Sequence, residues 1–352
     1  MLPRRELSRL FRQSETTSIH KFLLKLLRDA SQHAVPSVSG FHVGAIVHCE
    51  DSGNVYAGAN LEIQGATLGH TLHAEQAAVV TARAHGETRI THLAASAPPC
   101  GHCRQFLQEL PNAAGLKVLV PSADAGEHAV HLLGDLLPLS FSPGELGVPE
   151  HVHLLSQLRH GFRVPPAPAA PAGGSSGGVD LALVHAALEA ADSSYVPYTG
   201  ETSAAGVALR LPASGGDAGP VVSGSYMESC AYNPSIPPLQ AALVSCSAAL
   251  VTDDDDDDDG GAKQGNAGAG ASDGGVPWAD VEQLVLVHNA DSGGGSADQR
   301  RRGRQATIVE SVDHAASTIY LAGIALPQAR VEVLDCEEAA NILQTASAGG
   351  SG

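Results

Sequence analysis

Residues 73–107 read HAEQAAVVTARAHGETRITHLAASAPPCGHCRQFL and carry the clearest pattern of alternating helix and strand in the chain. Its alanine-rich start predicts a helix from about His73 to His85, and its apolar middle predicts a strand at Leu93 to Ala97. Two prolines then interrupt the chain, and a second helix is expected from Cys100 to Leu110. A histidine and a glutamate open the first predicted helix, and two cysteines open the second.

The flanks of this stretch continue the alternation. Apolar residues recur at helical spacing from Ser18 to His33, and strands are expected at Phe41 to Cys49 and at Val55 to Ala59, with the turn sequence EDSGN between them. A further strand is expected at Leu116 to Val120. This order of helices and strands predicts an α/β fold in which helices cover a sheet.

The second half of the chain repeats the first. Residues 58–62 (GANLE) align without gaps at an offset of 166 on residues 224–228 (GSYME). In that register His73 falls on Leu239 and Glu75 on Ala241, so the second copy is expected to have lost the polar pair. Other matches are Val35-Pro36 with Val196-Pro197, Gly44 with Gly206, and Ala77 to Val79 with Ala241 to Leu243.

Composition divides the chain into parts. The run PPAPAAPAGGSSGG at residues 165–178 predicts a linker, because none of its side chains can build a core. We therefore expect a first domain at 1–164 that includes the N-terminal helix, a degenerate domain at 179–345 and a flexible tail at 346–352. Within the second domain, 253–275 and 291–305 are expected to be disordered insertions.

Charge and cysteine content restrict the function. The 352 residues include 20 Lys and Arg against 38 Asp and Glu, giving a net charge of -18, of which seven come from the run at 253–259. An acidic chain is a poor match to nucleic acid, so no such partner is expected. Six cysteines do not make a disulfide scaffold, and no apolar stretch approaches the roughly 20 residues of a membrane span. We expect a cytoplasmic protein, with an organelle transit peptide as the alternative because of the arginines near the N-terminus.

The residues at the two helix starts suggest a metal site. His73, Cys100 and Cys103 would supply three protein ligands, which is typical of a catalytic zinc ion with an open fourth position. Glu75 would stand beside the ion without binding it and could move protons. Two alternatives remain: a redox role for the CGHC tetrapeptide, and a structural zinc with His70 as the fourth ligand. His102 is expected to point away from the site.

Five segments carry a resemblance to the cytidine deaminases of the two-domain, homodimeric type: FHVGA (41–45), GANLE (58–62), HAEQA (73–77), PCGHCRQFL (99–107) and GSYMESCAYNP (224–234). They include the His-x-Glu and Pro-Cys-x-x-Cys signature of zinc deaminases. The resemblance implies a three-layer α/β/α domain with a mixed five-stranded sheet, duplicated in a degenerate second copy.

The resemblance also implies roles for single residues. Zinc would bind to His73, Cys100 and Cys103, and Glu75 would be the proton shuttle. In substrate binding, Phe41 would pack on the pyrimidine, Asn60 and Glu62 would bind the ribose 3′-hydroxyl, and backbone groups of Ala74, Pro98 and Cys100 would hold the base. In a homodimer, Ala231 and Tyr232 would reach the partner's site.

These residues together predict the hydrolytic deamination of free cytidine and 2′-deoxycytidine to uridine and 2′-deoxyuridine. Glu62 can accept a hydrogen bond from a free hydroxyl and would repel a phosphate there. Two other functions are alternatives to this one. A deaminase of polynucleotides would need a basic groove, and an inactive zinc-bound scaffold would not need every ligand together with Glu75.

Overall fold

The computed structural model describes residues 18–122, 128–165, 175–176, 179–212, 219–252, 278, 280–281, 283–289 and 314–349. The start of the chain, the two predicted insertions and most of the predicted linker lie outside these residues. Described residues from 18 to 165 are called the first half below, and those from 175 to 349 the second half. Among the described residues no helix is both long and apolar enough to cross a membrane.

The first half is built around a mixed sheet with strand order β2-β1-β3-β4-β5. Strands β3 and β4 are parallel, and the other pairs are antiparallel. The elements in chain order are α2 (Ile19–Gln32), β1 (Gly44–Cys49), β2 (Val55–Ala59), η1 (Leu68–His70), α3 (Ala74–Ala84), β3 (Ile90–Ala95), α4 (Gly101–Phe106), η2 (Leu107–Glu109), η3 (Ala113–Gly115), β4 (Lys117–Pro121), β5 (His128–Leu132), α5 (Leu133–Leu136) and η4 (Pro143–Leu146).

The second half repeats this topology with strand order β11-β10-β8-β9. Strands β10 and β11 are parallel, and the pairs β8–β9 and β8–β10 are antiparallel, as in the first four strands of the other sheet. Its elements are β6 (Ser175–Ser176), β7 (Val179–Asp180), α6 (Leu181–Asp192), η5 (Glu201–Ser203), β8 (Ala205–Arg210), β9 (Val221–Ser225), α7 (Pro238–Thr252), β10 (Gln283–His288), α8 (His314–Ala325), β11 (Arg330–Asp335) and α9 (Cys336–Gly349).

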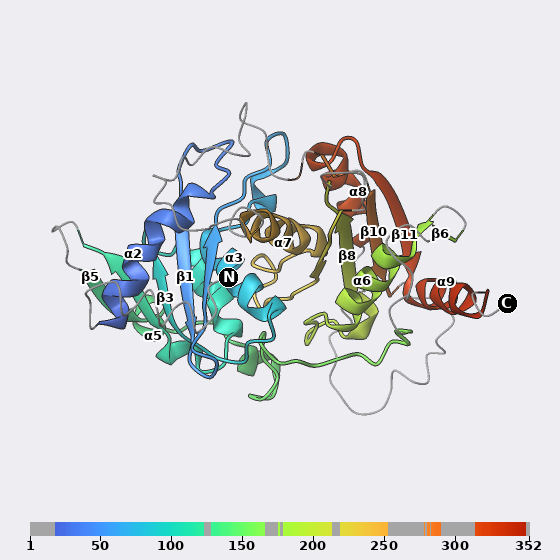
Figure 1. Ribbon diagram of the computed structural model, residues 1–352. Helices are drawn as coiled ribbons and strands as arrows, with labels where there is room; N and C mark the ends of the chain where they lie inside the picture. Colours follow the sequence, from blue (N-terminus) through green and yellow to red (C-terminus); the bar gives the residue numbers. More distant parts are fainter. Residues whose placement is uncertain are drawn as a thin grey trace.

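One continuous hydrophobic core joins the two sheets, and helices α3 and α7 lie between them (Figure 1). Side chains alternate between the faces of a strand, so in β1 Val47 packs against α3 while Ile46 packs against α2 on the outer face. In β8, Val207 likewise faces the central core and Ala208 faces α6. The inner layer, with α3 and α7 in contact, therefore lies between the sheets. The predicted α/β/α architecture and its duplication are confirmed.

Two details of the predicted sheets differ from the structure. The location of the edge strand β5 was not predicted, because its sequence HAVHL has no buried residue and does not alternate regularly between apolar and polar side chains. The main sheet of the second copy has four strands among the described residues, since helix α9 follows β11 where β5 follows β4. Helix α9 extends to Gly349, so the predicted end of the second domain at 345 falls inside a helix.

The register of the repeat also needs correction. A Cβ atom added to Gly58 would lie 2.2 Å from the amide nitrogen of Ala78, and one added to Gly224 would lie 2.1 Å from that of Ala242. These matching close approaches relate α3 to α7 by an offset of 164, whereas β2 and β9 are related by 166. His73 therefore corresponds to Pro237 and Glu75 to Leu239, not to Leu239 and Ala241.

The upstream match is likewise shifted by one residue. Val35 forms an isolated bridge with Leu61, and Tyr195 forms the equivalent bridge with Met227. Val35 thus corresponds to Tyr195 rather than to Val196. The match of Gly44 with Gly206 is confirmed, because each pairs with the last residue of the neighbouring strand. The conclusion that the second copy has lost the polar pair still holds, since both replacements lack a metal-binding or titratable side chain.

Imidazole rings gather where α2 meets the first sheet. The ring centroid of His92 lies 5.3 Å from that of His20 and 5.6 Å from that of His48, and His20 lies 5.7 Å from His128. Partial burial and the positive charge of Lys117 lower the pKa of His92 to about 4. Burial also lowers the pKa of His20 and of His48. The rings of His20, His48 and His92 are therefore neutral when α2 is docked at pH 7.

We expect the first half to lose stability as the pH falls from about 6.5 towards 4. The pKa of His92 is lower in the folded than in the unfolded chain, so acid favours the unfolded chain, and the contribution is complete only above the ordinary pKa. Because the ring is half exposed, we expect the free energy of unfolding to fall by about 1–2 kcal/mol. Urea unfolding at pH 5 and 7.5 measures it. His92→Asn should reduce the difference, whereas the exposed control His151→Asn should not; equal effects would contradict the prediction.

Candidate zinc site

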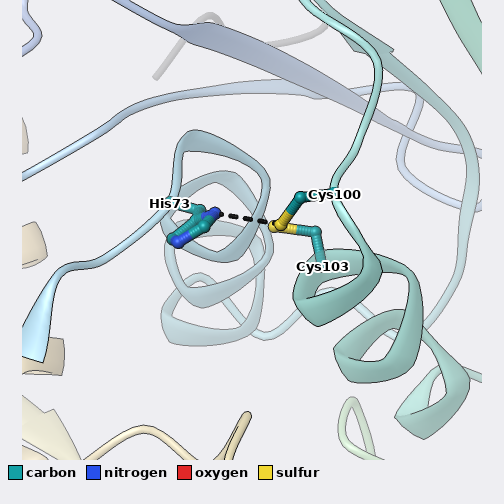
Figure 2. A group of neighbouring side chains, drawn as sticks. All are labelled: His73, Cys100 and Cys103. Atoms are coloured by element: carbon teal, nitrogen blue, oxygen red, sulfur yellow. Dashed lines mark hydrogen bonds between the residues drawn. The ribbon is translucent and has the colours of Figure 1, made fainter. Parts of the chain in front are cut away.

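Three predicted ligands converge between two helix starts (Figure 2). His73 is the N-cap of α3 and Cys100 is the N-cap of α4, and Cys103 lies one turn into α4. One ligand atom from each of the three lies within 4.8 Å of the others. The imidazole Nδ1 atom of His73 lies 3.4 Å from the Cys100 Sγ atom. Residues 27 positions apart in sequence thus meet at one point.

This donor set fits a zinc ion. With Zn–S bonds of about 2.3 Å and Zn–N bonds of about 2.0 Å, the sulfur and nitrogen ligands of a tetrahedral ion lie roughly 3.5 Å apart. The observed separation of 3.4 Å is close to this value. Two sulfurs and one imidazole are also ligands that zinc prefers, and three protein ligands leave a fourth position open. Within the described part of the chain this is the one such group of three.

Contacts among the three side chains favour the thiolate form of Cys100. Hydrogen bonds from Cys103 and His73 lower the pKa of Cys100 to about 3. The same contact with Cys100, together with burial, raises the pKa of Cys103 because its proton is held between the sulfurs. The hydrogen bond to Cys100 raises the pKa of His73. A divalent cation would take the place of these shared protons.

Glu75 lies on the first turn of α3, two residues after His73, and its side chain is only 4% exposed. Burial raises the pKa of its carboxyl group, although a hydrogen bond from Cys103 and the charge of His73 oppose this effect. A buried carboxyl with a raised pKa beside a metal site can both accept and return a proton near neutral pH.

Two other histidines, His102 and His70, lie near the predicted ligands in the sequence. The ring of His102 does not point away from the site, as had been predicted, but stacks on the ring of His73 with centroids 5.1 Å apart and planes 23° apart. His70 instead contacts Gln240, at 3.4 Å, and the ring of Tyr320. The structure therefore does not bring His70 into the ligand group, and a structural zinc with that fourth ligand is not supported.

Three of the residues predicted to bind the nucleoside, Phe41, Asn60 and Glu62, belong to one hydrogen-bonded group. The Asn60 side chain donates to the carbonyl oxygen of Phe41 at 3.0 Å and accepts from the amide of Val43 at 2.8 Å. It also donates to Glu62 at 3.3 Å. Phe41 is 61% exposed, whereas Asn60 and Glu62 are buried. The charge of Glu62 contributes to the raised pKa of His73, so this group lies within electrostatic reach of the ligands.

Glu62 also has a local structural function that sequence reasoning missed. Its carboxylate accepts hydrogen bonds from the amides of Val38 and Ser39, each at 2.8 Å, and from the Ser39 hydroxyl at 2.6 Å. These bonds outweigh burial and lower its pKa. Glu228 of the second copy accepts the equivalent bonds from Tyr198 and Thr199. A copy without the ligands keeps this glutamate, so the carboxylate also holds the preceding loop.

The remaining predicted contacts lie in different environments. Ala74 is buried as the first residue of α3, and Pro98 is exposed before the start of α4. Ala231 is half-buried, whereas Tyr232 is 58% exposed and has a positive φ of 59°. Both residues of this last pair lie in a turn of the second half that contacts the first half of the same chain.

Two buried residues of the first half that contact this turn were also missed. Gln76 donates from its side chain to the carbonyl oxygen of Pro234 at 3.2 Å, and Glu109 accepts from the amide of Cys230 at 2.7 Å. Their partners are 158 and 121 residues away, so no local pattern could reveal them. The one signal that the sequence offers for such a contact is a polar residue on the apolar face of a predicted helix, because a buried polar group needs a hydrogen-bond partner.

Comparison with known proteins identifies the family. Residues 17–115 and residues 133–258 each match the cytidine and deoxycytidylate deaminase zinc-binding region. The cytidine deaminase of Proteus mirabilis strain HI4320 is 38% identical over 269 residues, which are 76% of this chain and 74% of that protein.

The cytidine deaminase of Vibrio vulnificus strain YJ016 is 41% identical over 219 residues, covering 62% of this chain and 65% of the relative's length. A crystal structure of cytidine deaminase from Burkholderia pseudomallei covers 35% of this chain and all of its own, with 32% identity and a TM-score of 0.32. With the zinc-binding regions matched and the ligand set assembled, the chain belongs to the cytidine deaminase family.

Proposed function

We propose that this protein catalyses the hydrolytic deamination of cytidine and 2′-deoxycytidine to uridine and 2′-deoxyuridine, with release of ammonia. The observation that carries the proposal is the convergence of His73, Cys100 and Cys103 beside the buried carboxyl of Glu75. Zinc held by the three ligands would lower the pKa of a bound water to about 7. This combination suits hydrolysis of an amino-substituted ring.

In this proposal Glu75 carries protons twice. Its carboxylate first takes a proton from the attacking water and delivers it to N3 of the base, while the water oxygen forms a bond to C4. It then takes the remaining hydroxyl proton and delivers it to the amino group, and the C4–N bond breaks. The product is a carbonyl at C4 and ammonia, so one water is consumed in each turnover. The raised pKa of Glu75 favours both transfers near neutral pH.

Substrate binding is proposed to use the group around Asn60. Asn60 and Glu62 would hydrogen-bond the ribose 3′-hydroxyl, Phe41 would pack on the pyrimidine, and backbone groups of Ala74, Pro98 and Cys100 would hold the base. The exposed ring of Phe41 next to the buried Asn60 side chain supports this arrangement. The negative charge of Glu62 would disfavour a phosphate at the same place.

We also infer that two chains associate as a homodimer, with Ala231 and Tyr232 of each chain reaching the partner's site. The exposed ring of Tyr232 is the observation that supports this inference. Sedimentation of the zinc-loaded protein distinguishes one chain from two. A monomer that turns over cytidine would contradict it.

The ultraviolet absorbance of cytidine mixed with the purified zinc-loaded protein tests the proposed activity. We expect the absorbance to change to that of uridine, and the change to stop after treatment with a zinc chelator. Single-stranded oligonucleotides containing cytosine should not react, because the chain has an acidic excess of 38 carboxylates over 20 Lys and Arg. An unreactive cytidine, or a preference for the oligonucleotide, would refute the proposal.

A further inference from the structure

A short turn of the second half lies against both helices that carry the zinc ligands. This turn, residues 229–235, joins β9 to α7. The amide of Ser229 donates to the Ser235 hydroxyl at 2.9 Å, and the amide of Ser235 donates to the carbonyl of Tyr232, also at 2.9 Å. Because Tyr232 adopts the left-handed conformation, the turn is tightly curved. These bonds fix the directions of the backbone carbonyl and amide groups that the turn presents to the first half.

The first link from this turn reaches helix α3 through Gln76. The side-chain oxygen of Gln76 accepts a hydrogen bond from the amide of His73 at 3.2 Å, which holds the backbone of a zinc ligand. The side-chain nitrogen of the same residue donates to the carbonyl of Pro234, also at 3.2 Å. Gln76 is 2% exposed, so both bonds lie in the interior, where leaving either group without a partner is costly. One side chain therefore connects the second copy to His73.

The second link reaches the end of the other ligand-bearing helix through Glu109. This fully buried carboxylate accepts from the amide of Cys230 at 2.7 Å, from the Tyr198 hydroxyl at 2.6 Å and from the Tyr195 hydroxyl at 2.9 Å. Glu109 ends η2, which continues directly from α4. The turn is thus bonded to the helix of His73 on one side and to the helix of both cysteines on the other.

This arrangement explains why a copy without chemistry is retained in the fold. The equivalents of His73 and Glu75 in the second copy are Pro237 and Leu239, which cannot bind zinc or move protons. Its turn, however, supplies backbone partners to two buried polar residues of the first half. Metal sites depend strongly on the groups that orient their ligands.

We propose that the second copy positions the zinc site of its own chain, with Gln76 as the positioning residue that transmits the location of the 229–235 turn to His73. This proposal deepens the proposed function and rests on His73 being a zinc ligand. It does not depend on which base is deaminated. It is also distinct from the contribution to a partner's site, because Gln76 and Pro234 belong to one chain.

Zinc release tests the proposal without any substrate. Gln76→Met removes both hydrogen bonds at nearly the same side-chain volume, and we expect the zinc-loaded protein to release its metal to a colorimetric chelator about 10- to 100-fold faster than wild type. Ser235→Ala lies in the second half and removes the hydrogen bond that the Ser229 amide donates within the turn. It should also accelerate zinc release, although by less than Gln76→Met does. Because both act through one contact, the double variant should be no faster than Gln76→Met alone.

Two control variants match these changes. Gln108 is another buried glutamine, with bonds to Arg104 and Ser140 of the first half, and Ser247 of α7 donates to Leu243 in its own helix. Gln108→Met and Ser247→Ala should release zinc at the wild-type rate. In cobalt-loaded protein, Gln76→Met should shift the visible absorption bands, which a loss of global stability alone would not do.

The result that would overturn the proposal is release from Gln76→Met at the rate of Gln108→Met. An effect of Gln76→Met with none from Ser235→Ala would also overturn it, because Gln76 would then act by capping α3 without the second copy. If the protein holds zinc but does not convert cytidine, the proposed function fails while this test still gives its answer.

Discussion

Replacing Glu75 with alanine is expected to lower kcat/KM for cytidine by about 10²- to 10⁴-fold, which is the usual contribution of a positioned acid and base. Glu75 is the buried carboxyl beside the ligand group, and both proton transfers of the proposed reaction use it. The variant should still bind one zinc per chain, because none of the three ligands is changed. Steady-state kinetics and metal analysis of the same preparation measure the two quantities.

A second glutamate provides the matched control for this experiment. Glu87 is also buried in the first half, but its carboxylate accepts hydrogen bonds from Ser52, Asn54 and Tyr56. Glu87→Gln should reduce stability and leave kcat/KM within a few-fold of wild type. If Glu75→Ala turns over cytidine as fast as this control, Glu75 does not shuttle protons and the mechanism is wrong.

Replacing Cys103 with alanine is expected to remove both the metal and the activity. Cys103 is fully buried, and its loss leaves one thiol and one imidazole, which is too few ligands to retain zinc. We expect the bound zinc to fall to less than about one tenth of the wild-type content, with turnover falling by at least about 10²-fold. Atomic absorption of the dialysed protein measures the first quantity.

Cys246 is the control for the loss of a buried thiol. It lies on α7 of the second half and outside the ligand group, so Cys246→Ala should keep its zinc and its turnover. The contrast with Glu75→Ala separates two failures, because that variant loses activity with its zinc in place. Full zinc content in Cys103→Ala would show that the ion is held elsewhere.

Much of the fold could be predicted because it depends on local periodicity. The helix at 18–33 and the strand at 55–59 agree with α2 and β2 to within one residue. The strand predicted at 93–97 is β3, which begins three residues earlier, at Ile90. Ile90 is buried, but the two residues between it and Leu93 are only partly buried, so the pattern of a buried strand is interrupted there. Strand β5 escaped prediction because an exposed edge strand carries no buried face to produce a pattern.

The register error has an equally simple cause. Leu72 follows its bridge partner Leu61 by eleven positions, whereas Ile236 follows Met227 by nine. The loop before α3 is thus two residues longer than the turn before α7, and an alignment without gaps fails beyond it. Nothing in the sequence marks the two extra residues of the loop before α3, because both segments begin at equivalent bridge residues, Leu61 and Met227.

The amino-acid sequence was enough to predict the candidate ligands, the carboxyl of Glu75 beside them and the duplication. The His-x-Glu and Cys-x-x-Cys pairs rest on residue types at short spacing, which places each pair at one helix start, and the duplication rests on segments that repeat at a nearly constant offset. The tertiary structure alone decided that His102 stacks on His73 and that Gln76 and Glu109 bind the 229–235 turn. These contacts join residues far apart in sequence, and their geometry depends on how two sheets and their helices pack.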